Sequence, residues 1–65
     1  MKRHALLRHL RKEGCFLKRE GSSHSLWVNP RTGHIEAIPR HAEIVDRLAE
    51  KICRALSISG PKGWL

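Results

Sequence analysis

Aromatic residues are scarce in this 65-residue chain, which has no tyrosine, one phenylalanine and two tryptophans. Long apolar runs are missing too, since charged residues interrupt every stretch before the ~18 apolar residues that a membrane helix needs. The opening Met1-Lys2-Arg3-His4 is charged, but Arg8 and Arg11 interrupt the next apolar residues before the core of a signal peptide can form. We therefore expect a cytoplasmic protein with no membrane segment.

Cysteine is equally rare, and Cys15 and Cys53 stand far apart without a CxxC spacing. This excludes a disulfide framework and a zinc knuckle, and in a reducing cytoplasm such cysteines are usually small buried hydrophobes. The five histidines are scattered singly, whereas zinc sites normally show close ligand pairs backed by Cys or carboxylates. The sequence therefore predicts neither a metal nor another cofactor.

Positive charge, by contrast, is abundant, with 13 Lys and Arg against 6 Asp and Glu, for a net charge of +7. A chain this short makes one domain, in which roughly 60% of the unfolded surface can be buried. The basic balance indicates a polyanionic partner, and nucleic acid is the first expectation. Ribosomal binding proteins and membrane-surface proteins share such a charge, so the charge alone does not separate them.

The first helix is predicted from Lys2 to Glu13, where apolar residues recur at helical spacing and Gly14 comes next, at the position of a left-handed C-terminal residue. The opposite face carries five basic residues against one acid. The pattern fits two alternatives equally: a face that is only solvated and a face that binds RNA. Its candidate RNA contacts are Arg8, Arg11 and Lys12.

Three short strands are predicted after this helix, because β-branched, aromatic or alternating segments are separated by turns rich in Gly, Ser, Asn and Pro. In the third strand, Ile35 and Ala37 are expected on one face, with Glu36 and Ile38 on the other. Pro39 is expected to end the strand. The predicted strands span residues 15–20, 24–28 and 34–38, joined by turns at 21–23 and 29–33.

The second helix is predicted from Asp46 to Leu56, with Asp46 as its N-cap. Glu50 and Arg54 are spaced as an i,i+4 ion pair on its exposed face. An apolar stripe is spaced to pack against the sheet, and it consists of Leu48, Ala49, Ile52, Cys53 and Leu56.

The order α-β-β-β-α predicts an α+β sandwich of two layers, a three-stranded antiparallel sheet with both helices packed on one face. Residues 1–58 form the single domain. The tail at 59–65 lacks periodicity and is expected to be mobile, and the sequence does not say where its Trp64 docks.

This order resembles the double-stranded-RNA-binding fold, and the stretch from Lys2 to Ile58 is similar to the HicA toxins, which share that fold. The most specific motif is Gly21-Ser22-Ser23-His24, similar to the glycine-serine-histidine signature that opens the family's second strand. Many relatives have a single serine before the histidine, so which of the two serines takes the family position stays open. The other similar segments are 29–33, 38–44 and 48–56.

The resemblance implies a metal-independent endoribonuclease that cleaves mRNA, blocks translation and is neutralised by a HicB-type antitoxin. It also implies a monomer alone and a higher-order complex with the antitoxin. The catalytic residue would be His24. Two alternatives remain: a non-catalytic RNA-binding module of the same fold, and a toxin remnant that binds its partner without cutting RNA.

The residues fit this chemistry, since RNA cleavage without a metal needs a proton-transfer group and cations for the charge that develops on phosphorus. Histidine transfers protons near neutral pH. The turn's N–H groups and the hydroxyls of Ser22 and Ser23 are suited to hold a phosphate beside His24. Lys18 or Arg19, across the hairpin, is the expected cation.

The sequence indicates less specific roles for the other aromatic and histidine side chains. Trp27 is predicted to fill the small core rather than to stack on a base. His41 is equally suited to tethering the loop before the second helix and to a place in the site. No role is assigned to the remaining histidines, which are expected to face solvent; they are His4, His9 and His34.

Overall fold

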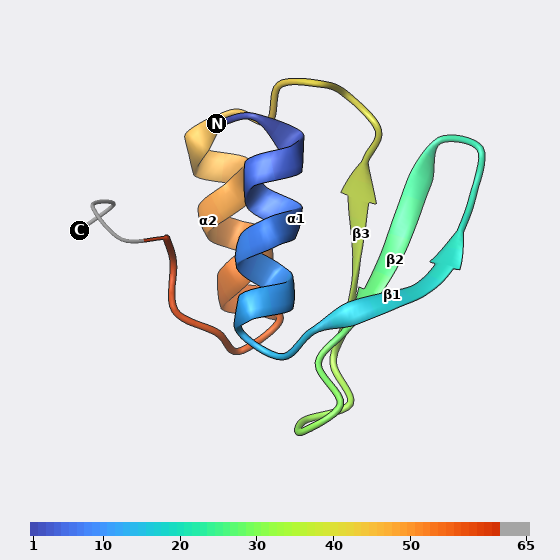
Figure 1. Ribbon diagram of the computed structural model, residues 1–65, viewed down its shortest axis with the longest axis vertical. Helices are drawn as coiled ribbons and strands as arrows, with labels where there is room; N and C mark the ends of the chain where they lie inside the picture. Colours follow the sequence, from blue (N-terminus) through green and yellow to red (C-terminus); the bar gives the residue numbers. More distant parts are fainter. Residues whose placement is uncertain (62–65) are drawn as a thin grey trace.

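The computed structural model describes residues 1–61 of the chain, which fold into two helices and a three-stranded antiparallel sheet of order β1-β2-β3. The two helices lie side by side against one face of the sheet (Figure 1). The predicted α+β sandwich is therefore confirmed. In chain order the elements are α1 (Arg3–Lys12), β1 (Phe16–Glu20), β2 (His24–Val28), β3 (Ile35–Pro39) and α2 (Asp46–Ala55).

The helix α1 ends as its sequence predicts, with Gly14 in the left-handed region at a φ of 93°. The Gly14 N–H donates to the Arg11 carbonyl at 3.0 Å, and the Cys15 N–H donates to the Leu10 carbonyl at 2.9 Å. This pair of hydrogen bonds is a Schellman motif, which satisfies carbonyl groups at the end of the helix. It turns the chain directly from α1 into β1.

The start of α2 differs from the prediction, because Val45 and not Asp46 is the N-cap, and no side chain caps the helix. Ile44 is buried and its N–H donates to the Met1 carbonyl at 2.8 Å, which keeps the chain extended through Val45. Asp46 is therefore the first helical residue. Its carboxylate still lies in the first turn, where negative charge is favourable to the helix dipole.

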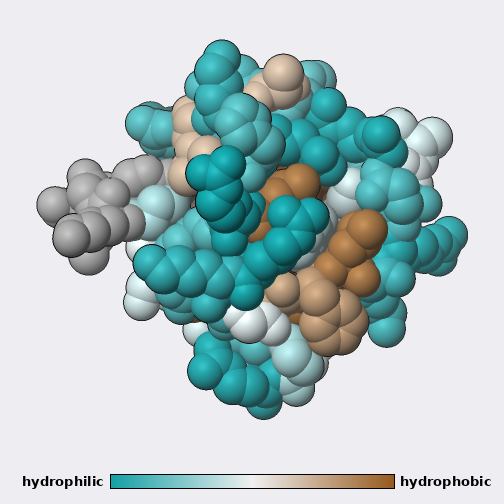
Figure 2. All heavy atoms as spheres, viewed as in Figure 1, coloured by the Kyte–Doolittle hydropathy of each residue, from teal (hydrophilic) through white to brown (hydrophobic). Residues whose placement is uncertain are grey.

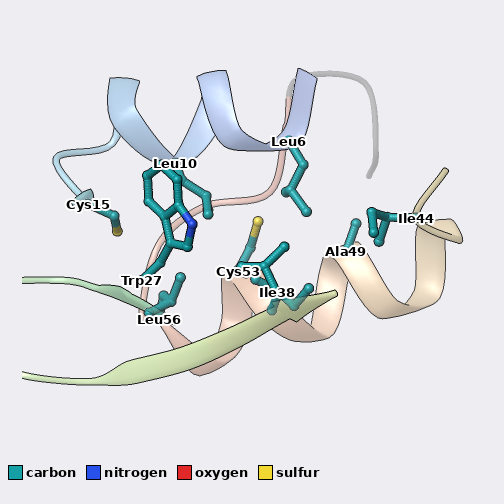
Figure 3. Packing of buried hydrophobic residues seen from close by; sticks show 10 residues of the cluster. Leu6, Leu10, Cys15, Trp27, Ile38, Ile44, Ala49, Cys53 and Leu56 are labelled. Carbon is teal, nitrogen blue, oxygen red and sulfur yellow. The ribbon is translucent and has the colours of Figure 1, made fainter. Parts of the chain in front are cut away.

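The core lies between the helices and the sheet, and Trp27 of β2 is its largest side chain, 1% exposed (Figure 3). This confirms the predicted core role of Trp27. The α2 stripe is confirmed as well, with Leu48 half-buried and its other members buried, and Glu50 and Arg54 form the expected ion pair at 3.5 Å. Buried around Trp27 are Leu6, Leu10, Cys15, Ile38, Ile44, Ala49, Ile52, Cys53 and Leu56.

Both cysteines are buried free thiols, as expected. Burial raises the pKa of the Cys53 thiol to about 11, and burial is also the main reason that the pKa of Cys15 is raised. Loss of solvation disfavours the thiolate, which is the reactive form. These two thiols therefore serve as core side chains.

The register of the sheet separates its two faces. The pairs Ser25↔Ile38 and Trp27↔Glu36 point to the helices. The other β2 and β3 residues point to the face that no helix covers, which we call the open face; they pair as His24↔Pro39, Leu26↔Ala37 and Val28↔Ile35. The predicted faces of β3 are confirmed, and Pro39 is its last residue, on an edge strand that tolerates the missing N–H.

The strand β1 adds two more side chains to the open face. Phe16 pairs with Val28, and Arg19 pairs with Leu26. The register shifts between Leu17 and Arg19, so Lys18 is the additional residue of a β-bulge. Without this shift, alternation along β1 would place Phe16 and Arg19 on opposite faces.

No helix within residues 1–61 is long and apolar enough to cross a membrane. The predicted tail is described only in part. The carbonyl of Ser59 lies 2.7 Å from Nε2 of His9, which ties the start of this segment to α1. Trp64 lies outside the described residues.

Candidate functional site

His24 is the first residue of β2, and its side chain is exposed at one end of the open face. It comes directly after the turn 21–23, which is closed by a hydrogen bond of 2.8 Å from the Gly21 N–H to the His24 carbonyl. A Cβ at position 21 would lie only 2.8 Å from that carbonyl oxygen, so the close approach requires glycine. The turn therefore fixes the backbone of His24 while its imidazole stays accessible.

Ser22 and Ser23 lie in this turn, and both are exposed. Their hydroxyls and the turn's N–H groups are near His24 by chain connectivity. The hairpin also brings β1 beside β2, with Arg19 on the same face as His24 and Lys18 at the bulge. The structure thus gathers these four predicted RNA contacts around the β1–β2 hairpin, and their roles stay predictions.

A polar network lies on the opposite side of this hairpin, facing the helices. Ser25, 1% exposed, donates from its hydroxyl to the Glu20 carboxylate at 2.9 Å. The same hydroxyl accepts a hydrogen bond of 2.8 Å from Nη2 of Arg3, whose Nε donates to the Pro39 carbonyl at 2.7 Å. Ser25 is next to His24 in the chain and Pro39 pairs with it across the sheet. One guanidinium from α1 therefore holds both neighbours of His24.

Arg40 extends this network to the outside of the molecule. Its Nη1 forms an ion pair with the Glu20 carboxylate and donates to the Gly21 carbonyl at 3.2 Å. The Arg40 side chain remains 47% exposed. It is thus a cation at the turn that sequence reasoning missed. Its place depends on the pairing of Pro39 with His24 across the sheet, which brings the next residue beside the turn and which no local sequence pattern gives.

The basic residues of α1 are not part of this arrangement. Arg8, Arg11 and Lys12 are exposed, but they lie in the helical layer, on the other side of the sheet from the open face. The guanidinium of Arg11 also stacks over the Trp27 ring, 5.1 Å from its centroid, so it has a structural contact. The structure therefore divides the predicted RNA contacts between two layers.

Two of the histidines expected to face solvent make contacts with the segment after α2. His9 is half-buried against the Ser59 carbonyl. His34 is exposed, and its Nδ1 lies 2.9 Å from the hydroxyl of Ser57. His41 is exposed and comes after Arg40 at the end of β3, on the site's side of the fold.

The open face also carries an aromatic side chain to which the sequence pattern assigns no role. Phe16 is 52% exposed. Its neighbour Cys15 is buried, and this alternation is the signal that points Phe16 away from the core. Figure 2 shows hydrophilic side chains over most of the visible surface, with an exposed apolar area where β1 crosses the front of the sheet.

Within residues 1–61, no group of three or more His, Cys, Asp or Glu side chains is gathered to hold a metal ion. Comparisons with protein-family models, curated proteins and solved structures give no match to this chain.

Proposed function

We propose that the protein is an endoribonuclease that cleaves mRNA, with His24 as its catalytic residue. The observation that carries the proposal is the exposed imidazole of His24 on a backbone held from three directions: by the Gly21 turn, by Ser25 and by Pro39. A proton-transfer group on a rigid strand end, beside exposed hydroxyls and cations, has the features that phosphodiester cleavage requires.

In the proposed reaction the RNA supplies its own nucleophile. The 2′-hydroxyl oxygen attacks the adjacent phosphorus as its proton leaves, and the bond from phosphorus to the 5′-oxygen breaks as that oxygen gains a proton. His24 performs one of these proton transfers. The products are a 2′,3′-cyclic phosphate and a 5′-hydroxyl. The reaction involves no change of oxidation state, so it needs no oxidant or reductant.

The surrounding groups stabilise the charge that develops on phosphorus. The hydroxyls of Ser22 and Ser23 and the N–H groups of the turn hold the phosphate oxygens. The cations come from Arg19 and Lys18 on β1 and from the exposed guanidinium of Arg40. Such preorganised donors are commonly the largest single contribution to catalysis.

The biological setting of the proposal rests on the sequence resemblance to the HicA toxins. The enzyme is a cytoplasmic monomer that blocks translation, and a HicB-type antitoxin neutralises it in a higher-order complex. Acidic groups of the antitoxin complement the net charge of +7, so the complex forms rapidly. Amide hydrogen exchange of the complex tests where it docks: we expect protection from Gly21 to Leu26, and unprotected amides there contradict blocking of His24.

The decisive experiment monitors growth and transcript integrity in cells that express the gene alone or with a neighbouring HicB-like gene. We expect growth arrest and cleaved mRNA in the first case and rescue in the second. Purified protein incubated with RNA then shows whether cleavage belongs to this chain. Intact RNA together with normal growth would contradict the proposal.

The second candidate is a non-catalytic RNA-binding module. The basic helix α1 favours it, because Arg8 and Lys12 lie on the layer away from His24 and fit binding better than cleavage. RNA that binds with high affinity and stays intact would support this candidate. A toxin remnant would also bind the antitoxin without cleaving RNA.

A further inference from the structure

Three side chains with different chemistry share the open face of the sheet. The register places Phe16 opposite Val28, Arg19 opposite Leu26, and His24 at the end of β2 on that same face. They are therefore arranged in order along the β1–β2 hairpin: an aromatic ring, then a cation, then the imidazole. From Val28 to His24 the strand covers about 13 Å at the usual rise per residue.

The exposure of Phe16 is not needed by the fold. The core is filled by Trp27, whereas Phe16 leaves 52% of its surface in water on a strand whose residues are all exposed. Its neighbours on this face are apolar: Val28 is buried at 9% exposed, and Ile35, which pairs with Val28, is 45% exposed. Exposed apolar residues that are grouped and bordered by polar side chains are typical of an interaction surface.

We propose that the open face binds single-stranded RNA, with one base stacked on Phe16, a backbone phosphate at Arg19 and the scissile phosphate at His24. The His24 end of this path rests on the proposed function, whereas the contacts at Phe16 and Arg19 do not. Every base has a π-face, so stacking on Phe16 tolerates many sequences while it sets where the strand lies.

The chemistry of the face selects an unpaired strand. In a double helix the bases are stacked inside, and recognition goes through phosphates and 2′-hydroxyls, which gives an exposed aromatic ring nothing to stack on. An apolar surface alone would equally suit a protein. The cations Arg19 and Lys18 on the same strand, in a chain of net charge +7, favour a polyanion instead.

The test measures binding separately from cleavage. Two full-length proteins are compared, His24→Ala and His24→Ala with Phe16→Ala. For each, the affinity is measured for an unstructured RNA of about twelve nucleotides that carries the fluorescent base 2-aminopurine. We expect Phe16→Ala to weaken binding about tenfold and to abolish the quenching of the stacked base. Phe16→Trp should restore both. The matched control is Val45→Ala, an apolar side chain 65% exposed at the start of α2, which should change neither.

The outcomes separate this inference from the proposed function. If the wild-type protein leaves RNA intact while Phe16→Ala still weakens binding, the ribonuclease proposal and the His24 end of the path fail, and the contacts at Phe16 and Arg19 stand. If the wild type cleaves RNA but Phe16→Ala keeps full affinity and quenching, the path fails alone. An effect of Phe16→Ala confined to the binding of an acidic protein would also overturn it. Thermal melts establish that every variant is folded at the assay temperature.

Discussion

Arg3 donates a hydrogen bond of 2.7 Å from Nε to the carbonyl oxygen of Pro39, the residue that pairs with His24 across the sheet. The first turn of α1 is thereby fastened to the strand end on which the proposed catalysis depends. Because Nη2 of the same guanidinium also reaches Ser25, the planar group fixes both strands in one geometry. Lysine has only one donor nitrogen and no rigid planar group, so it does not reproduce this pair of hydrogen bonds.

The first prediction concerns this contact. Arg3→Ala should lower the free energy of unfolding by about 1.5–3 kcal/mol, because hydrogen bonds from a charged donor to half-buried acceptors are lost. Arg3→Lys should recover part of that stability but less of the cleavage rate, since one ammonium nitrogen on a flexible chain does not reproduce the two donor nitrogens, Nε and Nη2, of the planar guanidinium. Melting curves and kcat, measured where all variants are folded, are the readouts. Equal kcat for Arg3→Lys and wild type would reduce Arg3 to a purely structural residue.

Much of the fold could be predicted from the sequence because local signals were strong. Apolar spacing and Gly14 indicated the extent of α1, and alternation in β3 correctly divided Ile35 and Ala37 from Glu36 and Ile38. These features depend on neighbours within a few residues. The predicted N-cap of α2 was wrong because the true one depends on a distant contact, the hydrogen bond between Ile44 and Met1.

The candidate site was predicted in part for the same reason. The turn and His24 form one local motif, whereas Arg40 reaches the turn only through the pairing of β3 with β2. Phe16 and Arg19 lie on the same face only because of the bulge at Lys18, and no pattern in the sequence predicts that bulge. Register between strands is set by the tertiary structure, so contacts that rest on it escape sequence reasoning.

The second prediction concerns salt. RNA affinity should fall steeply with ionic strength, and each neutralised phosphate of a single strand contributes about −0.7 to the slope of log K against log[salt]. Arg19→Ala should make the slope shallower by about that amount, because Arg19 lies on the open face. Arg8→Ala, in the helical layer, is the matched charge control. An equal change from both variants would mean that RNA contacts both layers, and a flat salt response would argue against phosphate contacts altogether.

The third prediction concerns the end of α2, which closes with the same two hydrogen bonds as α1 but has Ser57 in the left-handed region at a φ of 60°. A residue with a Cβ is strained there, so Ser57→Gly should stabilise the fold by about 1 kcal/mol. In a domain of this size that raises Tm by about 4–8 °C. Ser59→Gly is the control and should bring no gain. A lower Tm for Ser57→Gly would show that the contact between Ser57 and His34 outweighs the strain.

The last prediction is that His24→Ala abolishes cleavage and toxicity while it leaves the fold and RNA binding nearly unchanged. The His24 side chain is exposed and the neighbouring hydrogen bonds use backbone atoms or other side chains, so its removal should change stability by no more than about 0.5 kcal/mol. Loss of a proton-transfer group lowers a rate by about 10²–10⁴. Binding persists because the Lys and Arg side chains remain.

Melting temperature, gel-shift affinity and cleavage rate must be compared on matched preparations of wild type and His24→Ala. The control for loss of an exposed histidine is His4→Ala in α1, and His41→Ala tests the other histidine near the same strand end. A His24→Ala protein that melts far below wild type would make His24 structural. One that folds and still cuts at the wild-type rate would remove it from the mechanism. If His41→Ala loses cleavage as completely while it stays folded and binds RNA, His41 belongs to the site as well, and the second proton transfer is the role to test for it.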